Sequence, residues 1–474
     1  MNWTLALPEI VLALSGLVIL LAGVLPRRDM TFPCAMAVLG AFLLAGVLVL
    51  AQPDGTAFGG QYVSDAFARF MKVLTLGGAA LALLLALEWN RAEGLAKFEY
   101  PVLVLFATLG MLVMISANDL MSLYLGLELL SLSLYVMAAF DRDNPRSAEA
   151  GLKYFVLGAL SSGLMLYGMS LAYGFAGTTN FDRLAEVLTS PEAVSPGVIV
   201  GMVFMIAGLA FKVAAVPFHM WTPDVYEGAP TSVVAYFATA TKVGAIAVIV
   251  RVLSGPFGGL VEQWQQVIML ASLASMVLGA FAAIGQENIK RLMAYSWISH
   301  TGFVMMGLAV GGEAGLRGVL IYTPIYLIMS LGAFGVLVAM RRQGKAVEGV
   351  QDLAGLGRTD PAMALAMAIF MFSMAGIPPT AGFFAKLYVL LPAVQAGFWT
   401  LAVVGVLASV VSAFYYLRVV KVMYFDAPAA EPFDARPAGV SFVLAGTGLF
   451  SLLFFLLPAP LMAAATWAVA ALVR

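Results

Sequence analysis

The sequence predicts an all-α integral membrane protein with about fourteen transmembrane helices in a single transmembrane domain, residues 1–474. Hydrophobic residues make up 62% of the chain and charged residues only 11%, whereas soluble domains carry roughly 25% charged residues. The apolar residues form runs of about 18 or more, each long enough to cross a ~30 Å hydrocarbon layer as a helix. Because the runs are continuous rather than alternating, a spanning β-barrel is not expected.

Candidate spans follow one another with short connections, so no separate soluble domain is expected. They are placed at 5–25, 31–50, 67–87, 99–116, 119–139, 148–173, 196–221, 230–253, 265–285, 289–310, 316–340, 361–391, 398–424 and 439–470. The longest connections are 52–66, 174–195, 341–360 and 425–438. No basic segment precedes the first run, so we expect a retained span rather than a cleaved signal.

Composition excludes several classes of protein. The single cysteine, Cys34, rules out an internal disulfide and a cysteine-based metal or iron–sulfur site. Two histidines are too few for a histidine-rich metal site. A net charge of −1 without a basic patch gives no reason to expect nucleic acid as a partner.

The basic residues of alternate loops predict the orientation. One side carries fifteen: Arg27, Arg28, Arg91, Lys97, Arg142, Arg146, Lys290, Arg291, Arg341, Arg342, Lys345, Arg358, Arg418, Lys421 and Arg436. The other side carries six: Arg69, Lys72, Arg183, Arg251, Arg317 and Arg474. By the positive-inside rule the first side is cytoplasmic, so both termini are expected on the periplasmic side.

Four lysines and one carboxylate lie inside apolar runs, where a charge costs about 2.5–3.5 kcal/mol on insertion scales. They are Lys153, Lys212, Lys242, Lys386 and Glu128. Such groups must face the bundle interior, pair, or contact water. The plainer alternatives, snorkelling or a static salt bridge, weigh most for Lys153, which lies about one turn inside its span.

Buried lysines suit proton transfer because burial disfavours the ammonium form and a nearby carboxylate favours it. We expect Glu128 to pair with Lys153 and hold it charged. Breaking this pair would then let Lys153 and its neighbours discharge, which is a local electrostatic switch.

Both histidines lie within spans, and histidine titrates closest to physiological pH. His219 follows Lys212 by seven residues with Pro217 between them, which favours a functional role. His300 has Ser296, Ser299 and Thr301 nearby, whose hydroxyls could hold water. For His300 the alternative of a neutral, hydrogen-bonded packing residue weighs equally.

Proline is expected to break two of the spans, at Pro217 and at Pro378–Pro379. In lipid such breaks are tolerated only inside protein or along a water-filled cavity. The broken helices are the seventh and twelfth, which predicts two inverted five-helix repeats, helices 4–8 and 9–13. The expected regions are 1–95 for helices 1–3, 96–255 for the first repeat, 260–425 for the second and 438–474 for helix 14.

Three segments resemble the antiporter-like membrane subunits of respiratory complex I, the proton-pumping NADH:quinone oxidoreductase, and most of all the N type. They are HMWTPDVYEGAPTSVVAYFATATKVGA, QENIKRLMAYSWISHTGF and MAGIPPTAGFFAKLYVL. The resemblance covers essentially helices 4 to 13. The M type is expected to carry Glu in place of Lys386, and the L type a long lateral helix after the fourteenth span, which this sequence lacks.

The resemblance implies a charged axis of Glu128 and Lys153, then Lys212 with His219, then Lys242, then Lys386. It implies a translocase subunit of the respiratory chain in the bacterial inner membrane, without a redox cofactor of its own. FMN, iron–sulfur clusters and quinone are expected in partner subunits. The expected neighbours are an M-type subunit and small K- and J-type subunits, besides lipid, water and protons.

Two other classes are compatible with parts of the sequence. A subunit of a multisubunit Mrp-type Na⁺/H⁺ antiporter would share the helices and lysines, and neighbouring genes for flavin and iron–sulfur subunits would tell the two apart. A membrane scaffold has no need of five buried ionisable groups and two broken helices.

Overall fold

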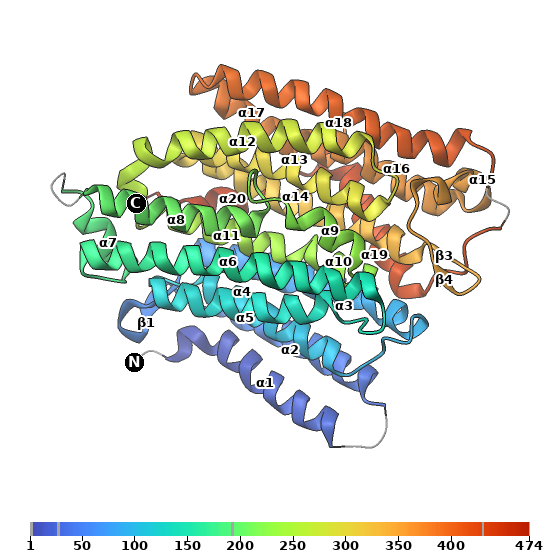
Figure 1. The fold of residues 1–474 in the computed structure, drawn as a ribbon, viewed down its shortest axis with the longest axis horizontal. Helices are drawn as coiled ribbons and strands as arrows, with labels where there is room; N and C mark the ends of the chain where they lie inside the picture. The colour runs from blue at the N-terminus through green and yellow to red at the C-terminus, as the bar shows by residue number, and fades with distance from the viewer. Residues whose placement is uncertain (1–2, 26–28, 191–193, 429–430, 474) are drawn as a thin grey trace.

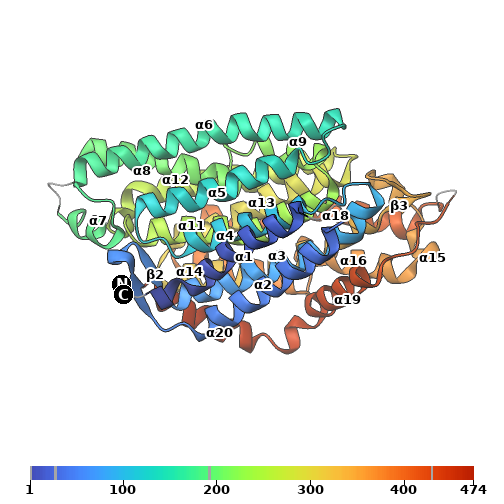
Figure 2. The ribbon, with the colours of Figure 1, turned by 90° about the horizontal axis from the view of Figure 1, so that it is seen from below.

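The computed structural model describes residues 3–25, 29–190, 194–428 and 431–473. Arg27, Arg28 and Arg474, which the orientation prediction uses, lie outside the described residues. The long helices run side by side as one bundle, and short elements close its two ends (Figure 1). Both ends of the chain lie at the same end of the bundle (Figure 2), which we call the terminal face. The other end is the opposite face.

The N-terminal half contains a row of long helices and a small hairpin on the terminal face. The helices are α1 (Leu7–Val24), α2 (Thr31–Ala51), α3 (Ala66–Ala92), α4 (Glu99–Ile115), α5 (Leu120–Ala138), α6 (Pro145–Ala176), α7 (Phe181–Val187), α8 (Pro196–Val213), α9 (Trp221–Gly228), α10 (Thr231–Phe237) and α11 (Ala240–Ser254). The hairpin pairs β1 (Gly55–Ala57) with β2 (Tyr62–Ser64) in antiparallel fashion.

The C-terminal half also contains long helices and a small hairpin, which lies on the opposite face (Figure 1). The helices are α12 (Val261–Ile284), α13 (Ile289–Val310), α14 (Gly312–Ala339), α15 (Leu356–Thr359), α16 (Pro361–Ala375), α17 (Ala381–Gln395), α18 (Trp399–Phe425), α19 (Ala438–Leu453) and α20 (Ala459–Val469). The hairpin is β3 (Arg341–Arg342) with β4 (Lys345–Ala346). Short 3₁₀ turns are η1 (Trp3–Ala6), η2 (Phe58–Gly60), η4 (Gly258–Leu260), η5 (Val350–Leu353) and η6 (Phe454–Leu456).

Among the described residues, eleven helices are long and apolar enough to cross a membrane. This confirms the all-helical membrane class. The centre of the bundle is formed by 231–254 and by α14, whose most apolar windows are 100% and 94% buried, against 39% for α1 and α2. Residues 231–254, which include Lys242, therefore lie inside, while α1 and α2 present apolar side chains outward.

Side-chain caps explain where several helices begin. Asp119 accepts hydrogen bonds from the backbone N–H of Met121 and Ser122 at the start of α5, and Asn288 does the same for α13. Such caps satisfy donors that have no partner inside the helix. The same two residues form isolated β-bridges, Asp119 with Asn180 and Asn288 with Gly349.

The expected breaks are present after α8 and after α16. Each half-helix ends at a residue with left-handed backbone, Ala214 (φ 58°) and Gly376 (φ 85°). At the first break, the freed carbonyl of Val213 accepts hydrogen bonds from Trp297 Nε1 and Thr301 Oγ1, both at 2.9 Å. The break is therefore enclosed by protein donors, as a break in a membrane helix requires.

Two spans that we expected to be continuous are interrupted. Residues 230–253 divide into α10 and α11, because Thr239 leaves the helical conformation and its hydroxyl bonds back to the Ala235 carbonyl at 2.6 Å. Residues 439–470 divide into α19 and α20 around Pro458, which cannot continue the helical hydrogen bonds. The first interruption lies immediately before Lys242.

Candidate proton-transfer site

Lys212 lies in the last turn of α8, beside the middle of α5. Its Nζ donates a hydrogen bond to Ser131 Oγ at 2.8 Å and lies 5.6 Å from the Phe211 ring centroid. Glu128 lies one turn before Ser131 on α5, and its buried Oε1 has no hydrogen-bond partner among the described residues. Glu128 therefore lies on the same face of α5 as Ser131, the residue that contacts Lys212.

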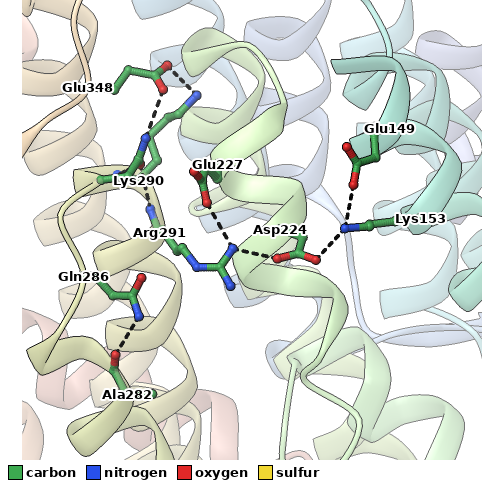
Figure 3. A network of polar contacts seen from close by, with 10 residues as sticks. Glu149, Lys153, Asp224, Glu227, Ala282, Gln286, Lys290, Arg291 and Glu348 are labelled. Carbon is green, nitrogen blue, oxygen red and sulfur yellow. Dashed lines mark hydrogen bonds and ion pairs between the residues drawn. The ribbon is translucent and has the colours of Figure 1, made fainter. Parts of the chain in front are cut away.

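The predicted pair of Glu128 and Lys153 is wrong. Lys153 Nζ lies 2.8 Å from Glu149 Oε1, one turn back on α6, and 2.8 Å from Asp224 Oδ2 on α9 (Figure 3). These two carboxylates satisfy the ammonium. The Lys153 side chain is 42% exposed in the isolated chain, so it does not lie in the interior with the other lysines.

Asp224 connects Lys153 with the second half of the chain. Its Oδ1 lies 2.6 Å from Nη1 of Arg291 on α13, and the same nitrogen lies 3.0 Å from Glu227 Oε2 (Figure 3). A cavity of about 230 Å³ at the opposite face is lined by this network, including Lys153, Asp224 and Arg291. Sequence reasoning missed Asp224, although it stands in the WTPDVYEGAP segment.

Lys242 is 2% exposed and begins α11. Its ammonium lies over three aromatic rings: Trp297 at 5.0 Å, Trp221 at 5.2 Å and Tyr226 at 5.5 Å from the centroids. The negative faces of such rings attract a cation without neutralising its charge.

Lys386, on α17, reaches back to the break before it. Its Nζ donates to the Ala375 carbonyl at 2.8 Å and to Ser409 Oγ at 2.6 Å, and it lies 5.2 Å from the Phe303 centroid. Gly376 leaves room for this arrangement, since an added Cβ there would lie 2.9 Å from Lys386 Cδ.

His300 is buried between three helices. Its Nδ1 lies 2.5 Å from the Tyr322 hydroxyl of α14, and its Nε2 lies 3.1 Å from the Tyr416 hydroxyl of α18. Of the hydroxyls expected near it, only Ser296 joins this group, by contacting Tyr416 at 2.5 Å. His300 therefore has the protein partners of a packing residue and also joins a hydrogen-bonded chain.

His219 lies at the surface of the first break and is partly buried. Its Nδ1 has no hydrogen-bond partner among the described residues. Among the described residues, no hydrogen bond therefore joins His219 to Lys212 or to Lys242.

A continuous set of aromatic contacts joins the three inner lysines. Phe211 stacks on Trp221 at 5.3 Å, and Trp221 and Trp297 both lie beside Lys242. The set continues from Trp297 through Tyr326, His300, Tyr322 and Phe303 to Lys386. Aromatic rings and ammonium groups thus form one row across the bundle, in which Phe211 and Phe303 are apolar members. The described ion pairs include none of Lys212, Lys242 and Lys386.

Two further lysines are buried as deeply as this row. Lys72 and Lys290 are 0% and 2% exposed, although their positions near span ends led us to count them with the loops. Lys290 Nζ lies 2.5 Å from Glu348 Oε1 and donates to the Ala229 carbonyl at 2.9 Å. The loop that carries Glu348 covers it, and nothing in the local sequence of α13 indicates this.

Comparison with known proteins identifies relatives over the whole length. The family described as "NADH:quinone oxidoreductase/Mrp antiporter, TM" matches residues 117–412. The chain is 61% identical to NADH-quinone oxidoreductase subunit N of Granulibacter bethesdensis, over 100% of both chains.

Solved structures share the fold. A chain of respiratory complex I from Thermus thermophilus is 32% identical, with a TM-score of 0.82, covering 96% of this chain and 98% of that chain. A chain of the Mrp complex from Dietzia sp. has a TM-score of 0.87 at 24% identity, covering 100% of this chain and 98% of that one. At that identity the second likeness establishes the fold alone.

Proposed function

Because the chain belongs to the NADH-quinone oxidoreductase subunit N family, we propose that it is a proton-translocating membrane subunit of respiratory complex I. The observation that supports proton transfer is the row of Lys212, Lys242 and Lys386, each held by neutral hydroxyl, carbonyl or aromatic partners. A lysine without a permanent counter-ion can gain and lose a proton, whereas one locked in a carboxylate pair is held charged.

The proposed route begins at Glu128, beside Lys212 on α5 and α8. The proton then passes from Lys212 to Lys242 along the rings of the first break, with His219 and water taking part. His300 and its two tyrosines lie between Lys242 and Lys386 and complete the row. Lys153, paired with Asp224, tunes the charge at the start of the route rather than carrying the proton itself.

The subunit contributes to an enzyme, a translocase, whose redox chemistry lies in other subunits. We propose that NADH oxidation on FMN, iron–sulfur electron transfer and quinone reduction all occur there, with an M-type subunit and small K- and J-type subunits as neighbours. Quinone reduction perturbs the charge at one flank of this chain, and the row of lysines responds. The chain is a multi-pass membrane protein, and we assign it to the bacterial inner membrane.

The count of fourteen spans is part of the same proposal. Three further spans added to the eleven long apolar helices make fourteen. They are α4, which has 17 residues, α13, whose 22 residues include polar ones, and the broken pair α16–α17. Basic residues concentrated at the opposite face support the assignment of that face to the cytoplasm and of both termini to the outside.

Inverted repeats are supported by matching local features in the two halves. The bridge from the cap of α5 to Asn180 lies at the terminal face, and the bridge from the cap of α13 to Gly349 lies at the opposite face. Counting from the prolines of the two breaks, Asp224 and Lys386 are equivalent, both seven residues after Pro217 and Pro379. Each is followed two residues later by tyrosine, in DVY and KLY.

The test replaces Lys212 with Met in the assembled complex, and measures NADH oxidation together with proton uptake in membrane vesicles. We expect fewer protons pumped per NADH. Lys97→Met, at an exposed lysine of the α3–α4 loop, is the matched control and is expected to pump normally. Full pumping by Lys212→Met would remove Lys212 from the route.

A further inference from the structure

A second group of buried ionisable side chains lies outside the row, near the terminal face. Glu9 of α1, Tyr62 of β2 and Lys72 of α3 are all less than one-tenth exposed. Lys72 Nζ lies 2.5 Å from Glu9 Oε1 and donates to the Tyr62 hydroxyl at 2.8 Å. That hydroxyl in turn donates to Glu9 Oε2 at 3.0 Å. Two hydrogen bonds and one ion pair therefore close a ring among the three groups.

Holding the helices together is a weak explanation for this group. Replacing a buried ion pair by well-packed apolar residues is often neutral or stabilising, and most of the other buried residues of α1 and α3 are apolar. Tyrosine, however, both accepts and donates a hydrogen bond. Lys72 can pass a proton to the Tyr62 oxygen while Tyr62 passes its own proton to Glu9.

One cavity is lined by members of this group, and a second is lined by the neighbouring residues of the hairpin. One, of about 350 Å³, lies between α1, α4 and α5 and is lined by Glu9 and Tyr62 together with Gln61 and Ser122. The other, of about 360 Å³ at the terminal face, is lined by Ser64 and other residues of the hairpin, besides several carboxylates. Glu9 and Tyr62 are thus the members of the group that line a cavity, whereas Lys72 lines neither of the two.

The inner side of the group approaches Lys242. Thr75, fully buried, lies one turn beyond Lys72 on α3. Gly78 lies six residues beyond Lys72, about 9 Å along the helix. There α3 packs on the α10–α11 interruption, since a Cβ on Gly78 would lie 3.5 Å from Ala240 Cα. Lys242 is two residues further along α11.

We propose that Glu9, Tyr62 and Lys72 form an outer proton-exchange site that connects the row of lysines with the water at the terminal face. This inference rests on the proposed function. In the release direction Lys72 gives its proton to Tyr62 as Tyr62 gives its own to Glu9, and Glu9 releases it to water in the cavity. Lys72, now neutral, takes the next proton from the row through Thr75 and water.

The test uses the assembled complex with Tyr62→Phe and, separately, Lys72→Arg. Tyr62→Phe removes the bridging hydroxyl and leaves the ion pair. Lys72→Arg keeps the positive charge, but guanidinium does not give up its proton in proteins. Tyr100→Phe, at another buried tyrosine, is the matched control. We expect both variants to assemble and oxidise NADH, with a loss of protons pumped per NADH equal to that in Lys212→Met.

Normal pumping in both variants, alongside a loss in Lys212→Met, would overturn the inference and leave the proposed function standing. Normal pumping in Lys212→Met as well would overturn the inference and also remove Lys212 from the proposed route. Failure of both variants to assemble, while Tyr100→Phe assembles normally, would also overturn the inference. It would mean that the group is needed for folding or assembly and not for proton transfer.

Discussion

The ion pair between Asp65 and Arg251 allows a quantitative test of how the terminal face is held together. Arg251 Nη1 and Nη2 donate to the two carboxylate oxygens of Asp65 at 3.0 and 2.9 Å, and both side chains are about one-tenth exposed. Asp65 also caps α3 by accepting from the Ala68 N–H at 2.6 Å. The pair therefore ties the start of α3 to the end of α11, the helix of Lys242.

Asp65→Asn keeps a capping oxygen and removes the charge, whereas Asp65→Ala removes both. Breaking a buried pair costs 3–5 kcal/mol, and the residual exposure argues for the lower end, about 3 kcal/mol. At about 1.4 kcal/mol per factor of ten, the first turn of α3 and the last turn of α11 should exchange their amide hydrogens about 100-fold faster. Loss of the cap in Asp65→Ala adds about 1 kcal/mol.

The assay is hydrogen–deuterium exchange of the assembled complex, read by mass spectrometry on peptides from α3 and α11, with the β3–β4 hairpin as internal reference. Unchanged exchange in Asp65→Asn would refute the reasoning, because it would mean that the cap alone holds this end. A uniform increase over all helices would refute it too, since the effect is expected to be local.

The same pair predicts a pH dependence. Burial alone would raise the pKa of Asp65, but the Arg251 ion pair and the hydrogen bond from Ala68 hold it below its usual value. A depressed carboxyl pKa contributes stability that is present above the unfolded value, near 4, and is lost as pH falls through the folded value. The difference between wild type and Asp65→Asn should thus be constant from neutral pH to about pH 5 and shrink only below about pH 4.

Three other substitutions have defined outcomes. Gly376→Ala, at φ 85°, adds a Cβ 2.9 Å from the stem of Lys386 and should lower proton pumping per NADH, whereas Gly397→Ala, at φ 82° with open space, should not. Glu348→Gln leaves the buried Lys290 ammonium without its carboxylate and should lower the stability of the folded chain by about 3 kcal/mol. The expected readout is less assembled complex on native gels, and adding Lys290→Met should restore the amount. Trp221→Phe removes the 3.0 Å bond to the Phe211 carbonyl and should cost about 1 kcal/mol, measured as faster amide exchange in α8.

Much of this architecture could be predicted from the sequence because lipid imposes strong rules. Continuous apolar runs identified the helices, and proline identified the breaks after α8 and α16. The interruption before Lys242 has no such signal, because AYFATATK contains neither glycine nor proline. It is set by the Thr239 backbone and the packing around it, which are properties of the folded chain.

The ion-pair partners of the buried and intramembrane lysines were harder to predict than the positions of these lysines along the chain. Lys153 was recognised as an intramembrane charge, but its partner Asp224 lies 71 residues away and becomes a neighbour only when α9 packs beside α6. Lys72 and Lys290 were counted as loop charges because the sequence shows only how far a residue lies from a span end. The sequence does not show that the β1–β2 hairpin covers Lys72 or that the loop with Glu348 covers Lys290 in the folded chain.

The equivalence of Asp224 and Lys386 bears on why a row built from two similar halves has a direction. Two inverted copies of one backbone, alone, would favour neither sense of travel. At the matching positions, Asp224 forms ion pairs with Lys153 and Arg291. Lys386 forms no ion pair with a described carboxylate. In the proposed arrangement of inverted repeats, the two halves therefore differ in the charge that they hold at this matching position.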